Sequence, residues 1–269
     1  MIVISPDLTL AAVGDYSPNS PVIGWDTVIT AVVADSEDAD YPASNLLNDS
    51  TALRWQAGSG ATQYLTFTVP GGEQVDYLAI ARHNFGTIAA TISVETQAPG
   101  GGEPWVEVIE EFIPANDTPI IARFTPQNAV GVRLKIQPAG EIPRAAVAYV
   151  GLLLVMQRRV YVGHTPIVYG RSARITNARS ESGDFLGRIV LAESLDTAVE
   201  FQNLTPAWYR STLEPFIEAS KETPFFFAWR PATYPTEVGF CWMTNEPRPS
   251  NQRPNGMMQI SFQMSGVKS

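Results

Sequence analysis

The sequence is poor in the residue types that small secreted domains and most hydrolases depend on. It contains one cysteine, Cys241, and two histidines among 269 residues. A single cysteine excludes an intrachain disulfide and a cysteine-rich zinc site, so stability has to come from packing. We therefore expect Cys241 to be a small buried apolar residue.

Catalytic motifs are absent as well. The sequence has no Gly-x-Ser-x-Gly elbow, no glycine-rich phosphate loop and no His-Glu-x-x-His pair. Only His83 and His164 offer general bases with an unperturbed pKa near neutrality, and both lie in turns without a surrounding motif. We expect structural roles for both, no catalytic residue, no enzymatic activity and no cofactor.

Basic residues are also few. Lys and Arg number 18 against 27 Asp and Glu, a net charge of -9. Phosphate binding needs clustered basic residues, so we expect no nucleic-acid partner. The N-terminus lacks a basic region before an apolar run, and the longest apolar stretch, Ala145 to Met156, is too short to span a bilayer. The sequence predicts neither a secretion signal nor membrane insertion.

What the sequence does have is a regular series of strand patterns. Val-, Ile- and Thr-rich runs recur about every ten residues from Trp25 to Met156, which is typical of an all-β sandwich. The alternation in the runs after Trp55 predicts that each buries one face. Large aromatic residues supply most of a core's area, so we expect Trp55 and Trp105 inside it. We expect this sandwich to fold alone.

The chain divides into three parts. Residues 1–24 form an extended arm that closes a sheet in one domain or the other, residues 25–156 form the sandwich, and residues 157–269 form a smaller β-rich domain. In that last part, Asn177 to Ala192 reads as a strand pair broken at Ser182-Gly183. Thr205-Pro206 predicts the start of one short helix, which Pro215 should kink or restart.

Charge is distributed unevenly between the parts. Arginines gather just after the boundary, at Arg158, Arg159, Arg171, Arg174, Arg179 and Arg188. They form either a phosphate-binding face or a surface that pairs with the acidic half of a neighbouring copy, and we favour the second. The acidic run from Asp35 to Asp40 is either a Ca²⁺ site or a solvated loop. It lacks the ligand order of an EF-hand loop, so the solvated loop is favoured and no metal site is assigned.

The segment from Asn45 to Trp55 resembles the opening motif of the discoidin or galactose-binding-like family of jelly-roll β-sandwiches, with the acidic position shifted by one residue to Asp49. The later runs Ile92 to Gln97, Trp105 to Val108 and Gly131 to Gln137 follow the family's order. The resemblance implies that loops at one end of the sandwich bind sugars or lipid headgroups. The residues it nominates are the aromatic side chains of Tyr41 and Phe85, with Arg54 and Arg82 as polar partners.

The C-terminal part resembles minor tail proteins of long-tailed bacteriophages. The resemblance rests on SGDFLGR, a helix containing WYRSTLEPFIEA, the run TPFFFAWRPATYPTEVGFCWM and a closing SFQMSGV. It implies a structural component of a virion tail tip or baseplate, assembled in the host cytoplasm. The implied partners are other tail proteins, further copies in a ring and a host cell-surface glycan. The alternative is a free carbohydrate-binding module with a small partner domain.

Aromatic residues crowd the stretch from Pro224 to Met243. One small domain can hardly bury all seven rings, and aromatic residues and arginine are enriched in interface cores. We therefore predict that Trp229, Arg230 and Tyr234 contact another copy or a tail neighbour. The alternative is that all seven rings fill a β-sandwich core.

Overall fold

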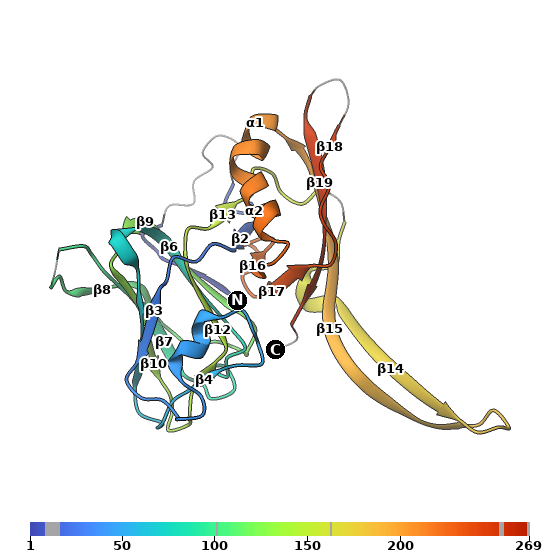
Figure 1. The fold of residues 1–269 in the computed structure, drawn as a ribbon, viewed down its shortest axis with the longest axis horizontal. Helices are drawn as coiled ribbons and strands as arrows, with labels where there is room; N and C mark the ends of the chain where they lie inside the picture. Colours follow the sequence, from blue (N-terminus) through green and yellow to red (C-terminus); the bar gives the residue numbers. More distant parts are fainter. Residues whose placement is uncertain (9–16, 101, 162, 253–255, 268–269) are drawn as a thin grey trace.

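The computed structural model describes residues 1–8, 17–100, 102–161, 163–252 and 256–267, and Figure 1 shows its fold. The chain is mainly β-structure, with a short helical segment late in the sequence. The expected fold class, all-β with one short helix, is confirmed. In the part of the chain described, no helix is long and apolar enough to cross a membrane.

Two sheets face each other in the N-terminal half. The first has four strands in the order β1 (Ile2–Ile4), β9 (Ile120–Asn128), β6 (Gln74–Ala81) and β12 (Val147–Gly151). The second has five strands in the order β3 (Ala31–Ala34), β5 (Gln63–Thr68), β10 (Gly131–Gln137), β7 (Thr91–Gln97) and β8 (Trp105–Phe112). A small ladder of β4 (Trp55–Gln56) and β11 (Arg144–Ala145) and two short turns, η1 (Ala43–Leu47) and η2 (Pro70–Gly72), complete the sandwich.

The second half forms one large sheet. Its strands run in the order β13 (Leu154–Val155), β2 (Val22–Gly24), β16 (Phe225–Ala228), β17 (Val238–Met243), β19 (Met258–Gly266), β15 (Phe185–Leu204) and β14 (Arg171–Arg179), and β18 (Ser250–Asn251) pairs with β19. The N-terminal segment contributes to both halves, because β1 pairs with β9 in the sandwich and β2 pairs with β16 here.

A helical segment covers one face of the large sheet. It consists of α1 (Pro206–Trp208), a wider turn η4 (Tyr209–Leu213) and α2 (Glu214–Ala219), and a separate turn, η3 (Ile167–Tyr169), lies before β14. The segment starts after Thr205, as the Thr-Pro pair predicts, and Pro215 lies in the first turn of α2. A proline is tolerated there because the first turn leaves backbone N–H groups unbonded.

Three apolar clusters bind these elements into stacked layers. One fills the sandwich between its two sheets and a second lies between the large sheet and the helical segment. The third lies between the large sheet and the β1-β9-β6-β12 sheet of the sandwich. Strand β16 shows the arrangement: Phe225 and Phe227 belong to the helix-side cluster, while Phe226 belongs to the sandwich-side cluster.

The expectation that the strands after Trp55 each bury one face is confirmed for β5, whose residues alternate between buried and less buried, but was wrong for β6, which is covered on both faces. In β6, Leu78 and Ile80 point into the sandwich core, whereas Tyr77 and Ala79 pack against the large sheet. A strand covered on both sides reads as a continuous apolar run, which is the pattern of VDYLAIA. The layers approach closely at Gly24, where a Cβ would lie 2.8 Å from the Tyr77 ring.

The core predictions had mixed outcomes. Trp55 is fully buried, and its Nε1 donates a hydrogen bond to the Ser36 carbonyl at 3.2 Å. The prediction for Trp105 was wrong: it is half-buried on strand β8, with the Arg133 guanidinium 4.4 Å from its ring centre. Cys241 is fully buried, as expected, and burial raises the pKa of its thiol well above the usual range.

Strands β14 and β15 form a two-stranded arm that extends well away from the rest of the molecule (Figure 1). The predicted strand pair between Asn177 and Ala192 is therefore confirmed, but it is longer than expected. Strand β15 continues to Leu204, and from Leu195 onward it pairs with β19. Residues 197–202 belong to the inner end of this one strand.

Candidate functional site

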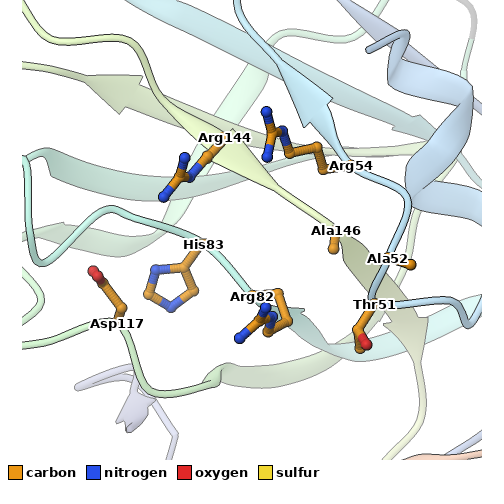
Figure 2. Close-up of a pocket in the computed structure, with 8 residues that line it drawn as sticks. All are labelled: Thr51, Ala52, Arg54, Arg82, His83, Asp117, Arg144 and Ala146. Carbon is orange, nitrogen blue, oxygen red and sulfur yellow. The ribbon is translucent and has the colours of Figure 1, made fainter. Parts of the chain in front are cut away.

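A polar hollow of about 300 Å³ opens at one end of the sandwich, and we call it the arginine basin (Figure 2). Its lining consists of Thr51, Ala52, Arg54, Arg82, His83, Asp117, Arg144 and Ala146. These residues come from four separate segments of the chain. Figure 2 shows the three arginines around a shared space.

Strand pairing brings two of the arginines together. Arg54 immediately precedes β4, and Arg144 begins β11, which pairs with β4 through Arg144 opposite Gln56. The Arg54 guanidinium lies 4.2 Å from the centre of the Tyr41 ring. A cation over an aromatic face is attracted to it, so Tyr41 holds Arg54 in place.

Arg82 enters the basin from the turn after β6. Its backbone has a φ of 55°, in the left-handed region that side-chain-bearing residues rarely adopt. Such a conformation costs about 1–3 kcal/mol and persists where the surrounding structure enforces it, often at functional sites. Here the following residues, His83 to Phe85, are buried and fix the turn.

His83 is a neutral, buried ring beneath the basin. Its Nε2 lies 2.9 Å from the Thr118 carbonyl, which only accepts, and its Nδ1 accepts the Phe85 N–H at 3.2 Å. The two bonds together require the tautomer with hydrogen on Nε2. Burial lowers the pKa of His83 from its usual 6.5 to about 4. The expected structural role of His83 therefore matches its contacts.

Asn84 and Asp117 shape the rim of the basin. Asn84 donates to the Ile142 carbonyl at 3.0 Å and accepts from the Arg144 N–H at 2.9 Å, which anchors the segment carrying Arg144. Asp117 accepts the Thr87 N–H at 2.8 Å. With His83 neutral, the charged side chains that line the basin are three arginines and one carboxylate, Asp117. This balance favours an anionic ligand, because the planar guanidinium fork matches a carboxylate or phosphate.

Of the nominated ligand residues, the structure brings three to the basin and buries the fourth. Arg54 and Arg82 line the basin, and Tyr41 lies directly behind Arg54. Phe85 was nominated wrongly as a loop aromatic, because it is fully buried and stacks on His83 with ring centres 4.6 Å apart. Sequence reasoning missed Thr51, Asp117 and Arg144. Thr51 lies on the same segment as Arg54, whereas Asp117 and Arg144 come from segments distant in the sequence, and no local pattern marks those two.

The nominated interface residues lie together elsewhere, at the end of β16. The Trp229 and Tyr234 rings stack with centres 5.4 Å apart, and the Arg230 guanidinium lies 5.5 Å from the Trp229 ring. Tyr234 is 42% exposed, whereas Phe225, Phe226, Phe227 and Phe240 are buried. The seven rings therefore do not all fill a core, and a contact to another chain at this cluster stays a prediction.

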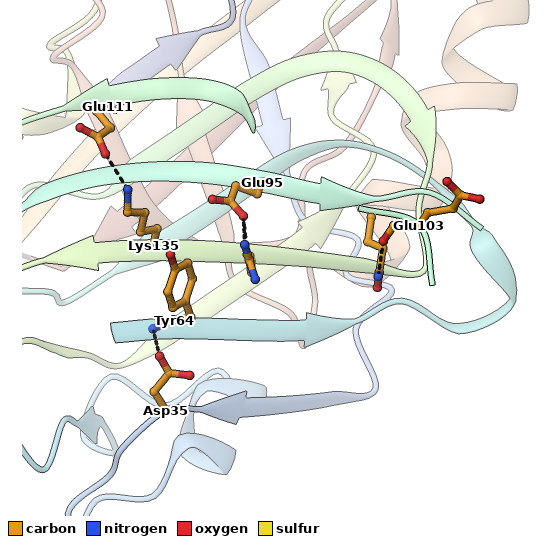
Figure 3. Close-up of polar contacts among 8 residues, drawn as sticks. Asp35, Tyr64, Glu95, Glu103, Glu111 and Lys135 are labelled. Atoms are coloured by element: carbon orange, nitrogen blue, oxygen red, sulfur yellow. Dashed lines mark hydrogen bonds and ion pairs between the residues drawn. The ribbon is translucent and has the colours of Figure 1, made fainter. Parts of the chain in front are cut away.

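The acidic run before η1 uses its carboxylates locally. Glu37 accepts the Ala43 N–H at 2.7 Å, Asp38 accepts the Asp40 N–H at 2.9 Å, and Asp35 accepts the Tyr64 N–H at 3.1 Å. Figure 3 shows the last of these bonds. Among the residues with described positions, no three His, Cys, Asp or Glu side chains group in a way that could hold a metal ion.

His83 and Asp76 make opposite contributions to the pH dependence of stability. Burial raises the pKa of Asp76 to about 6, against the lowering effects of the Leu153 N–H bond and of Arg123. A group whose pKa is lowered in the folded protein, such as His83, makes the protein less stable as pH falls, because the unfolded chain binds the proton more tightly. Asp76, whose pKa is raised, makes the protein more stable as pH falls, because here the folded chain binds the proton more tightly.

Replacing His83 by glutamine is therefore expected to change the slope of stability against pH. Relative to the wild type, the variant should gain on the order of 3 kcal/mol in unfolding free energy between pH 6.5 and 4. Asp76→Asn should shift the slope in the opposite direction. Urea unfolding at several pH values measures both. Parallel curves for the wild type and His83→Gln would contradict a buried neutral imidazole.

Comparison with known proteins gives matches at the level of structure. No protein-family model matches the chain, and no curated protein matches it in sequence. Among solved structures, a pectin binding carbohydrate binding module is 17% identical, covers 46% of this chain and 91% of its own, and has a TM-score of 0.40. The family 32 module of NanJ from C. perfringens, in complex with galactose, has 19% identity, 45% and 91% coverage and a TM-score of 0.39.

The CBM32 of AlyQ, in complex with 4,5-unsaturated mannuronic acid, has 18% identity, 47% and 96% coverage and a TM-score of 0.38. Each match spans just under half of this chain and nearly all of one carbohydrate-binding module. None of these three structures is a phage tail protein. At these identities and scores the matches describe a similar backbone and say nothing about the ligand of this chain.

Proposed function

We propose that the sandwich binds a carbohydrate in the arginine basin and prefers sugars that carry a carboxylate. The observation that supports this proposal is the convergence of Arg54, Arg82 and Arg144 on one hollow of about 300 Å³. A hollow of this size accommodates a small ligand such as one or two sugar rings. Its three guanidinium groups provide paired donors for a carboxylate, while Thr51 and Asp117 offer partners for hydroxyl groups.

Replacing Arg82 by glycine distinguishes a binding role of this residue from a structural one. Arg82→Gly removes the guanidinium and also relieves the left-handed backbone, which glycine adopts at no steric cost. We expect the variant to be at least as stable as the wild type and to lose at least tenfold in affinity, about 1.4 kcal/mol, for polygalacturonate fragments. Calorimetric titration and thermal unfolding measure the two effects.

Ala89→Gly is the matched control, because Ala89 also has a left-handed backbone, with a φ of 47°, and does not line the basin. This control should keep full affinity. Neutral galactan should bind the wild type more weakly than polygalacturonate, and added salt should weaken binding of the acidic probe. Equal affinity of the wild type and Arg82→Gly for polygalacturonate would overturn the proposal.

A second candidate function is that of a structural component of a bacteriophage tail tip or baseplate, without catalytic activity. The specific observation that favours it is the arm of β14 and β15. Six of its large apolar side chains are between 40% and 66% exposed: Ile175, Phe185, Leu186, Ile189, Val190 and Leu191. An exposed apolar surface of this kind is typical of a contact with another protein.

Antibody labelling of purified virions in negative-stain images tests this second function. A tail component should label one end of the tail, and a variant with the arm shortened between residues 176 and 190 should fail to enter virions. Protein found free in the medium and absent from virions would contradict a tail role and would leave the free carbohydrate-binding module as the alternative.

A further inference from the structure

Two strands of opposite charge form open edges of different sheets. Strand β14 is the last strand of the large sheet, and its nine residues include Arg171, Arg174 and Arg179 with no acidic residue. Strand β8 is the last strand of the five-stranded sandwich sheet, and its eight residues include Glu107, Glu110 and Glu111 with no basic residue. Within the described residues, β14 pairs only with β15 and β8 pairs only with β7.

Both edges are accessible. All but one of the β14 residues are exposed, and Glu107, Glu110 and Glu111 are exposed on β8. Apolar groups accompany the charges, since Val106 in β8 and Ile113, the residue after its last, are 56% and 58% exposed. On the arm, Ile175 lies opposite Val190 in the register, so two exposed apolar side chains share one face.

An open edge strand presents unpaired N–H and C=O groups and readily adds another strand. The charge of an edge determines which strand can be added to it. Two β14 edges repel each other, and so do two β8 edges, whereas β14 and β8 attract. Residues 171–191 carry a net charge of +2. Because the whole chain carries -9, the remainder carries -11. The arm therefore complements the rest of a second copy.

The two edges also lie on opposite sides of the molecule. Figure 1 shows the arm on one flank and β8 on the far flank of the sandwich. One chain therefore cannot pair its own two edges. A contact between different surfaces of identical subunits is head-to-tail, and it produces a ring if the rotation closes and a filament if it does not.

We propose that β14 of one copy pairs edge to edge with β8 of a second copy, so that the chain assembles head to tail. The inference deepens the structural role given above as the second candidate function. The salt bridge that β8 already makes to β10 is compatible with it. Glu111 accepts from the Lys135 ammonium at 2.7 Å, as Figure 3 shows, which leaves Glu107 and Glu110 as the principal charges facing a partner.

Charge reversal tests the pairing in the full-length protein. One variant carries Arg174→Glu and Arg179→Glu on the arm, and the other carries Glu107→Arg and Glu110→Arg on β8. Each alone should sediment as a 29.3 kDa monomer under conditions in which the wild type forms larger species. Mixed in equal amounts, the two variants should assemble again, because each altered edge meets a complementary one.

Circular dichroism checks that both variants fold, which we expect because all four positions are exposed on the surface. A wild type that stays monomeric at every concentration would overturn the proposal. The proposal would also be overturned if either variant by itself assembled as the wild type does, or if the mixture of the two stayed monomeric. None of the four substituted residues lines the arginine basin, so polygalacturonate binding by the two variants tests the carbohydrate proposal separately from assembly.

Discussion

Trp55→Ala is expected to lower the free energy of unfolding by about 3–5 kcal/mol, the usual cost of removing a large buried aromatic side chain. The Trp55 side chain is fully buried in the sandwich core, and its indole N–H bonds to the Ser36 carbonyl. Removal leaves a cavity and an unpaired carbonyl. Because Trp55 is on β4, next to the basin, the loss should also loosen Arg54 and Arg144.

Two controls divide this effect into its parts. Trp55→Phe keeps an aromatic ring and loses the hydrogen bond, so it should cost about 1–3 kcal/mol. Trp242→Ala removes an indole that is 40% exposed and should cost less than about 1 kcal/mol. Urea unfolding measures all three variants. A cost below about 1 kcal/mol for Trp55→Ala would place the ring at the surface and contradict its assignment to the core.

Phe226→Ala is expected to cost about 3–5 kcal/mol and to uncouple the two halves of the chain. Phe226 lies between the large sheet and the sandwich, where its ring centre is 5.4 Å from that of Tyr149 and 4.9 Å from that of Phe240. The apolar cluster around it is the main contact between the halves. We expect one unfolding transition for the wild type and two for the variant.

The adjacent residue provides a matched control. Phe227 lies on the same strand and is equally buried, but it faces the helical segment. Phe227→Ala should cost a similar amount and leave a single transition, because it weakens the large sheet without opening the contact with the sandwich. Calorimetry distinguishes the two patterns. Two transitions in the wild type would show that the shared cluster does not couple the halves.

Local signals in the sequence predicted local structure well. Thr205-Pro206 marks the start of a helix because a proline at the first helical position acts locally, although the Thr205 side chain makes no capping bond and accepts from Gln157 instead. The Ser182-Gly183 turn marks the hairpin through a similarly local preference. The length of β15 was not predictable in this way. Its inner half is held by β19, more than fifty residues later in the sequence, and its outer half has no core that would leave an alternating pattern.

The site followed the same division. Arg54 and Arg82 were nominated through the family resemblance and both line the candidate basin, whereas Arg144 comes from a segment that the β4–β11 pairing brings near. Phe85 was misplaced because a loop aromatic was expected to be exposed, while the turn at Arg82 folds it under the basin beside His83. Whether a turn residue faces outward depends on backbone angles that no sequence pattern records here.

The central claim, that the arginine basin is the ligand site of the sandwich, is tested most directly by mapping where an acidic oligosaccharide binds on the whole chain. Amide chemical shifts of isotope-labelled protein titrated with a galacturonate oligomer provide that map. The predicted result is a saturable set of shifts around Thr51, Arg54, Arg82 and Arg144, absent in Arg82→Gly and retained in Ala89→Gly. Shifts confined to another face, or no saturable shifts at all, would contradict the claim.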